Sequence, residues 1–255
     1  MTADLKMVLL VGSAPDAVLA KDWDLSMFAH RVAINNAWQI TPDWDYLVYP
    51  EDFASERLPL TPLKPSQQLI AASQFVPQQN SFGGFVYAGG TMAFTAGYWV
   101  LGALKPDLIA FLGCDMVYGS STGKSSHFYG QGTADPLRVD VTLQSLEAKS
   151  VRFMSLAHMQ QCAVVNLSEL PESRLLFPRV SRLDLTLPQL PKQLLRQQAK
   201  LLNPAAAIRA LQAEQDLGYM VASGRYWEHA AEFDKTKLSG IDSLWLQSVT
   251  TVPSY

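Results

Sequence analysis

Small and polar residues stand directly after two apolar runs near the start of the chain. The runs are Met7–Val11 and Arg31–Ile34. The residues that follow them are Gly12, Ser13, Ala14, Asn35 and Asn36. A glycine turn lets backbone amides approach an anion or a ribose, and a carboxamide offers two donors and an acceptor to a base edge or a sugar hydroxyl. The pattern predicts a ligand site, against the alternative that these are ordinary turn and cap residues.

Two further candidate positions flank a stretch of small apolar residues, Thr91–Leu104, that reads as a helix. Gly89 and Gly90 precede this stretch, Thr91 begins it, and Asp115 follows the apolar run that comes after it. Open α/β sheets bind ligands beside the carboxyl ends of their strands, so both positions are candidates for contacts with a ligand. Asp115 is suited to bind a hydroxyl, orient a tyrosine or hold a metal, and equally to cap a turn.

His127 is the best candidate for acid–base chemistry among the four histidines. It lies in a polar segment, whereas the other three fall beside a predicted strand or inside predicted helices. An imidazole with a pKa near neutral can act as a base or an acid. Tyr118 and Tyr129 flank it and could donate hydrogen bonds to a departing phosphate oxygen. The alternative is a solvated loop histidine.

The segment Gly119–Ser125 resembles a phosphate-binding loop but departs from the pattern. It has three residues between its glycines where the Walker motif has four, and a poor helix former follows it. Without a helix N-terminus the segment lacks the amides and dipole that hold a phosphate. We expect a mobile flap here instead. The three-glycine fingerprint of NAD and FAD sites is also missing.

Composition narrows the class of protein. The chain has 255 residues, 48% of them apolar, and 20 basic against 23 acidic residues give a net charge of −3. This balance offers no basic stripe for nucleic acid. No run approaches the ~20 apolar residues that span a bilayer, and no secretory core is seen, so we expect a cytoplasmic protein. Cys114 and Cys162 lie in apolar runs and are expected to be buried thiols.

Strand and helix signals alternate up to about Leu187. The expected strands are Met7–Val11, Arg31–Ile34, Tyr46–Tyr49, Leu69–Ala72, Phe85–Tyr87, Leu108–Leu112 and Cys162–Leu167. The clearest expected helices are Ala17–Phe28, Thr91–Leu104 and Leu143–Gln161, whereas the proline-rich span Leu58–Gln79 is expected to be mostly irregular. Because several strands are continuously apolar, the pattern predicts an α/β fold with a mostly parallel sheet covered by helices on both faces.

The composition changes after Pro188, which divides the chain into an α/β domain, residues 1–187, and a helical appendage, residues 188–255. Two apolar stripes are separated by Asn203 and Pro204, a cap and a first helical residue. The stripes are Leu194, Leu195, Leu201 and Leu202, then Ile208, Leu211, Leu217 and Met220. Further helical stretches are expected at Tyr226–Glu232 and Ser243–Val249. The appendage is predicted to pack on the α/β domain or on a second subunit.

Five short motifs, in this order, resemble glycosyltransferase family 42, the bacterial sialyltransferases, and a broader set of bacterial and phage proteins related to the archaeal 6-hydroxymethylpterin diphosphokinase. The motifs are Val11-Gly12-Ser13-Ala14-Pro15, Ile34-Asn35-Asn36, Gly89-Gly90-Thr91-Met92-Ala93, Leu112-Gly113-Cys114-Asp115-Met116 and Ser126-His127-Phe128-Tyr129-Gly130. The resemblance spans roughly residues 5–180. It is more specific for the fold than for the activity.

This resemblance implies a Rossmann-like domain that binds a CMP-linked sugar across its strand ends and needs no metal or cofactor besides the donor. The residues it assigns to the nucleotide are Gly12, Ser13, Ala14 and Asn35, with Gly89, Gly90 and Thr91 in the loop before the central helix. It assigns leaving-group assistance to tyrosines of the flap, for which Tyr118 is the nearest match.

The chain departs from the family at the general base, where Gln131 stands in place of a histidine, and at Gly89, which replaces a serine. An amide cannot accept a proton at neutral pH, so His127 would have to act as the base. We therefore expect a transferase that moves a sugar from a nucleotide-activated donor to a hydroxyl acceptor, such as a glycan. The alternatives are a non-catalytic nucleotide- or sugar-binding module that forms a homo-oligomer through its C-terminal helices, or a diphosphokinase, for which Asp115 and Asp135 alone offer metal ligands.

Overall fold

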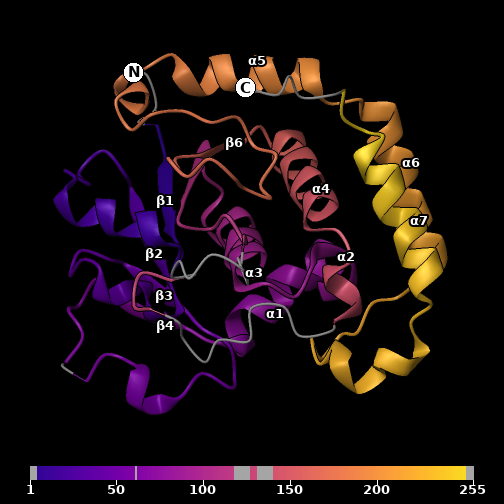
Figure 1. Cartoon of the computed structure of the whole chain (residues 1–255), viewed down its shortest axis with the longest axis horizontal. Helices are drawn as coiled ribbons and strands as arrows, with labels where there is room; N and C mark the ends of the chain where they lie inside the picture. The colour runs from indigo at the N-terminus through magenta and orange to yellow at the C-terminus, as the bar shows by residue number, and fades with distance from the viewer. Residues whose placement is uncertain (1–4, 61, 118–126, 131–139, 251–255) are drawn as a thin grey trace.

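A computed structural model of the chain describes residues 5–60, 62–117, 127–130 and 140–250. Six strands form one parallel sheet with the order β4-β3-β2-β1-β5-β6 (Figure 1). They are β1 (Met7–Val11), β2 (His30–Ile34), β3 (Tyr46–Val48), β4 (Gln68–Ile70), β5 (Leu108–Leu112) and β6 (Ala163–Asn166). The chain runs outward from β1 to β4 and returns to place β5 beside β1. The fold is Rossmann-like, as predicted, and its topological switch point lies between β1 and β5.

Both faces of the sheet are buried, which explains the continuous apolar strands. Val8 and Leu10 of β1 belong to one core cluster, and Leu9 belongs to the other. The first cluster includes side chains of α1 (Ala72–Ser81), α2 (Phe85–Ala88), α3 (Met92–Trp99) and α4 (Leu146–Met159). The second includes side chains of the 3-10 helix η1 (Pro15–Asp22). Residues Val100–Leu104 extend α3 as a π-helical turn.

Several predicted elements take another form in the structure. The prediction of a strand at Phe85–Tyr87 is wrong, because these residues form the short helix α2 between Gly84 and Gly89, which both have positive φ. A short, fully buried apolar run cannot be assigned by periodicity alone. The predicted helix Ala17–Phe28 is the shorter η1, which has no side-chain cap at its start. Helix α1 occupies part of the span expected to be irregular.

The C-terminal residues form α5 (Leu190–Leu201), α6 (Pro204–Leu217), the 3-10 helix η7 (Tyr226–Glu232) and α7 (Lys235–Leu246). Asn203 caps α6 as predicted, its side chain accepting from the Ala206 amide at 3.1 Å. The predicted apolar stripe on α6 is wrong in part, because Ile208 is 61% exposed. The helix buries Ala206, Ala207, Ala210 and Glu214 instead. The buried face of α6 therefore consists mainly of alanines, which allow close helix packing.

Two ion pairs that are buried between helices hold the C-terminal helices against the α/β body. Lys149 of α4 pairs with Asp242 of α7 at 2.6 Å, and Arg152 of α4 pairs with Glu214 of α6 at 2.8 Å. Figure 1 shows α6 and α7 side by side, with α4 between them and the sheet. The C-terminal helices therefore share a core with the preceding residues, although the domain boundary at 187/188 stays a prediction.

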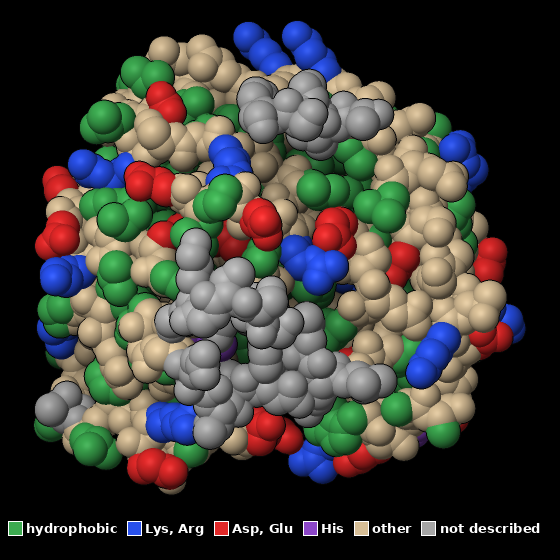
Figure 2. All heavy atoms as spheres, in the orientation of Figure 1, with side chains coloured by type: hydrophobic (Ala, Val, Ile, Leu, Met, Phe, Trp, Pro, Cys, Tyr) green, Lys and Arg blue, Asp and Glu red, His purple; other side chains and the backbone are tan. Residues whose placement is uncertain are grey.

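None of the helices within the described ranges is long and apolar enough to cross a bilayer. Acidic and basic side chains are interspersed over the face of the molecule in Figure 2. Cys114 and Cys162 are buried free thiols, as predicted, and burial raises the pKa of each above its usual value.

Candidate functional site

Most of the predicted site residues line one cleft of about 580 Å³ at the carboxyl edge of the sheet. Loops after β1, β2 and β5 meet there, together with the turn before α3. The predicted residues that line it are Gly12, Ser13, Ala14, Asn35, Asn36, Gly90, Thr91, His127 and Tyr129. Segments from distant parts of the sequence therefore converge at the switch point of the sheet, where this class of fold places its ligands.

The turn after β1 is held tightly against the end of β5. The Gly12 amide donates to the Leu112 carbonyl at 2.8 Å, and the Ala14 amide donates to the Gly113 carbonyl at 2.9 Å. The Ala14 amide is thus committed to this junction and does not serve an anion, contrary to the prediction. Among the described residues the Ser13 amide has no hydrogen-bond partner, so it is the amide of this turn that a ligand can use.

Replacement of Gly12 by alanine should destabilise the protein. A Cβ at this position would lie 2.3 Å from the Gly113 carbonyl oxygen, and backbone cannot move aside as a flexible side chain can. We expect a loss of roughly 1–3 kcal/mol of unfolding free energy, measured by urea denaturation. Gly240→Ala is the matched control, because nothing lies within 4 Å of its Cβ and it sits in α7. Equal stability of the two variants would contradict the role given to Gly12.

Asn35 ends β2 in a conformation that few residues adopt. Its φ is +52°, in the left-handed region, which asparagine tolerates better than most residues. Its Oδ1 is shielded from solvent and has no hydrogen-bond partner among the described residues. A buried acceptor without a partner costs free energy, and such groups in native proteins call for an explanation. Asn35 also lines the cleft, and an acceptor that lacks a partner suits a ligand donor such as a base amino group or a sugar hydroxyl.

His127 lies against the same turn and is mostly buried. The Phe128 amide donates to the Ser13 carbonyl at 2.9 Å, which ties residues 127–130 to the β1 turn. The His127 and Tyr129 rings stack, with centroids 5.0 Å apart. Burial lowers the pKa of the His127 imidazole below its ordinary 6.5, since the charged form loses its hydration. The imidazole is therefore neutral at pH 7, the form in which it can accept a proton.

Among the described residues, Gly89 and Asp115 were predicted to contact a ligand but do not line the cleft. Gly89 packs against α4, since a Cβ there would lie 3.1 Å from Lys149. Asp115 is 1% exposed, and its Oδ1 accepts from the side-chain amide of Asn166 at 3.2 Å. Burial raises the pKa of the neighbouring Asp16, and Asp115 adds to that rise. Tyr118 lies outside the described residues, as do Gln131, Asp135 and the segment Gly119–Ser125.

Sequence reasoning missed three charged residues of the cleft. Asp52 and Arg57 come from the connection between β3 and β4, and Asp140 precedes the 3-10 helix η5 (Val141–Leu143). The Arg57 carbonyl accepts from the Trp38 indole at 3.0 Å, which holds this connection against the residues after β2. Arg57 supplies a permanent positive charge. In the sequence Asp140 lies two residues before Thr142, a spacing typical of a capping turn. Nothing in the sequence predicts that Asp140 lies close to Gly90.

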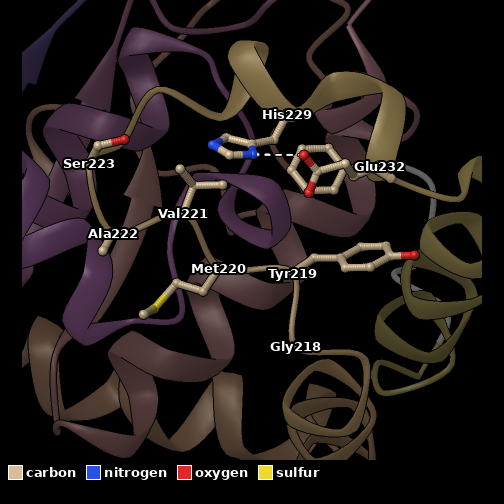
Figure 3. A pocket seen from close by; sticks show the side chains of 9 residues that line it. Gly218, Tyr219, Met220, Val221, Ala222, Ser223, His229 and Glu232 are labelled. Carbon is tan, nitrogen blue, oxygen red and sulfur yellow. Dashed lines mark hydrogen bonds and ion pairs between the residues drawn. The ribbon is translucent and has the colours of Figure 1, made fainter.

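A second cavity of about 500 Å³ lies in the C-terminal part of the chain (Figure 3). It is lined by residues 218–223 together with His229, Glu232 and Phe233. His229 and Glu232 bond to each other at 2.9 Å, and both are substantially exposed. All these residues come from one continuous segment, and none was predicted to bind a ligand. The cleft at the sheet edge remains the better candidate, because it gathers polar groups from several separate loops.

The cleft combines groups for binding with one group for proton transfer. Arg57 and the Ser13 amide suit an anion, Asn35 suits a base or a hydroxyl, and neutral His127 can take a proton. Within the ranges that the structure describes, no three or more His, Cys, Asp or Glu residues are grouped as metal ligands would be.

Comparison of the chain with protein-family models, with curated proteins and with solved structures finds no match. The sialyltransferase resemblance therefore stays a prediction from the motifs. The structure shows the fold and the cleft.

Proposed function

We propose that the cleft binds a nucleotide-activated sugar and that the protein transfers the sugar to a hydroxyl acceptor. The observation that supports this most is the convergence of the β1 turn, Asn35, the Gly90–Thr91 turn and His127 on one cleft. These are the positions that the family 42 resemblance assigns to the nucleotide and to the flap. A donor linked through CMP is the form that the resemblance favours.

The reaction would be a direct displacement at the anomeric carbon of the sugar. The acceptor oxygen forms a bond to that carbon while its proton passes to a ring nitrogen of His127. The bond between the carbon and the phosphate oxygen breaks, and the electron pair leaves with the nucleotide. Tyr129 stacks on His127 and would fix the orientation of the ring. Tyr118 would donate a hydrogen bond to the departing phosphate oxygen.

His127 sets an expected pH dependence. A base must be unprotonated, and burial lowers the pKa of His127 from 6.5. We therefore expect kcat/KM to rise with pH through a limb centred below pH 6.5 and then to level off. The profile is measured from about pH 5 to 8 with the donor at low concentration. A limb centred above pH 7, or a rate without any acidic limb, would exclude His127 as the base.

Release of free nucleotide from candidate donors tests the function itself. CMP-sialic acid, a UDP-sugar and a GDP-sugar are incubated with the protein and a mixed panel of glycan acceptors, with and without magnesium. We expect CMP release in the absence of magnesium. Magnesium-dependent consumption of ATP would favour the diphosphokinase alternative, and binding without turnover would favour the non-catalytic module. The cytoplasmic location and a homo-oligomer formed through the C-terminal helices stay predictions.

A further inference from the structure

The C-terminal segment reaches the cleft through one chain of hydrogen bonds. The Tyr226 hydroxyl of η7 donates to Oδ2 of Asp140 at 2.7 Å. Oδ1 of Asp140 accepts from the Thr142 hydroxyl at 2.7 Å, and the Thr142 hydroxyl oxygen accepts from the Gly90 amide at 3.0 Å. This series of hydrogen bonds thus links Tyr226, which lies 86 positions beyond Asp140, to the turn that opens α3.

The space around Gly90 shows how closely this chain is packed. A Cβ on Gly90 would lie 2.1 Å from the Tyr226 hydroxyl oxygen and 3.1 Å from Oγ1 of Thr142. Glycine is therefore required here for the approach of Tyr226, and not only for the approach of a ligand. Gly90, its neighbour Thr91 and Asp140 all line the cleft.

We propose that Tyr226 is a positioning residue for the cleft, which fixes the wall formed by Gly90 and Thr91 through Asp140 and Thr142. This inference rests on the proposed function insofar as the cleft binds a nucleotide. Thr142 and Tyr226 bond to different carboxylate oxygens of Asp140, so Asp140 connects these two groups. The affinity of the cleft then depends on the docking of the C-terminal segment.

The variant Tyr226→Phe isolates the hydroxyl. The ring of Tyr226 stacks on Phe85, with centroids 6.0 Å apart and planes at 24°, and phenylalanine keeps this contact. Tyr219→Phe is the matched control, because its hydroxyl comes from the same segment but accepts from the Asp234 amide at 3.3 Å and does not line the cleft. Each variant loses one hydroxyl.

The first measurement needs no ligand. Hydrogen exchange of the Gly90 amide should be about tenfold faster in Tyr226→Phe than in the wild type. Loss of the charge-assisted hydrogen bond to Asp140 lets Asp140 and Thr142 move, and Thr142 is the acceptor that protects the Gly90 amide. Tyr219→Phe should leave this exchange rate unchanged. In a Thr142→Val background, Tyr226→Phe should add nothing, because the chain is already broken. Wild-type protection of Gly90 in Tyr226→Phe, or additive effects in the double variant, would overturn the proposal.

The second measurement is the affinity for CMP by titration calorimetry. We expect the dissociation constant to rise about tenfold in Tyr226→Phe and to stay constant in Tyr219→Phe. Faster exchange at Gly90 with an unchanged affinity would overturn the positioning role. If the wild type does not bind CMP while Gly90 exchange still accelerates, the proposed function fails and control of the wall by Tyr226 is supported.

Discussion

Glu214→Ala should be among the most damaging single substitutions in this protein. Glu214 accepts two hydrogen bonds from Arg152, both at 2.8 Å, and a third from the Trp245 indole at 2.7 Å, and its side chain is 4% exposed. The substitution leaves the guanidinium of Arg152 buried without its carboxylate. Breaking a buried ion pair in this way costs about 3–5 kcal/mol, a large part of the ~5–15 kcal/mol that stabilises a typical domain.

The measurement is the unfolding free energy from urea denaturation, with Glu232→Ala as the matched control. Glu232 also pairs with a basic side chain, His229, but its side chain is 70% exposed, so its loss should cost little. The double variant Arg152→Met/Glu214→Leu removes both charges and should be less destabilised than Glu214→Ala alone. If Glu214→Ala were as stable as the control, the C-terminal helices would not be held as described.

His127→Ala should remove most of the activity without unfolding the protein. A positioned general base contributes about 10²–10⁴-fold to a rate, so kcat should fall by that factor in the nucleotide-release assay. The affinity for CMP should change little, because the nucleotide is assigned to the β1 turn and to Asn35. His229→Ala is the control histidine, since it lines the second cavity and not the cleft. Full activity in His127→Ala would assign the base to another residue.

The fold could be predicted from the sequence where an apolar run was long and a turn-forming residue followed it. The strands β1 and β5 were predicted to the residue, because each is a run of five apolar residues that a glycine follows directly. The segment Phe85–Tyr87 is helical and not the predicted strand, since three consecutive buried residues show no periodicity that distinguishes a strand from a helix. The tertiary role of α6 was hidden for another reason: its buried face consists of alanines and a glutamate whose partner, Arg152, is 62 residues away.

The site could be predicted in part, because strand ends of a parallel sheet meet at one edge. Sequence alone placed the β1 turn, Asn35 and His127 at that edge, and the structure brings them into one cleft. It could not assign Gly12 to the contact with Gly113, since that contact depends on β5 lying beside β1. Nor could it find Arg57 or the link from Tyr226 to Asp140, which depend on contacts between distant segments.

A thermal-shift titration of the wild type and Asn35→Ala with CMP decides whether this cleft is a nucleotide site. A ligand at about 100 times its dissociation constant adds about 2.7 kcal/mol, which for a chain of this size raises Tm by roughly 5–10 °C. We expect such a rise in the wild type without magnesium and a much smaller one in Asn35→Ala, which lacks the Oδ1 acceptor. The same rise in both proteins, or none in the wild type, would contradict a nucleotide site in this cleft.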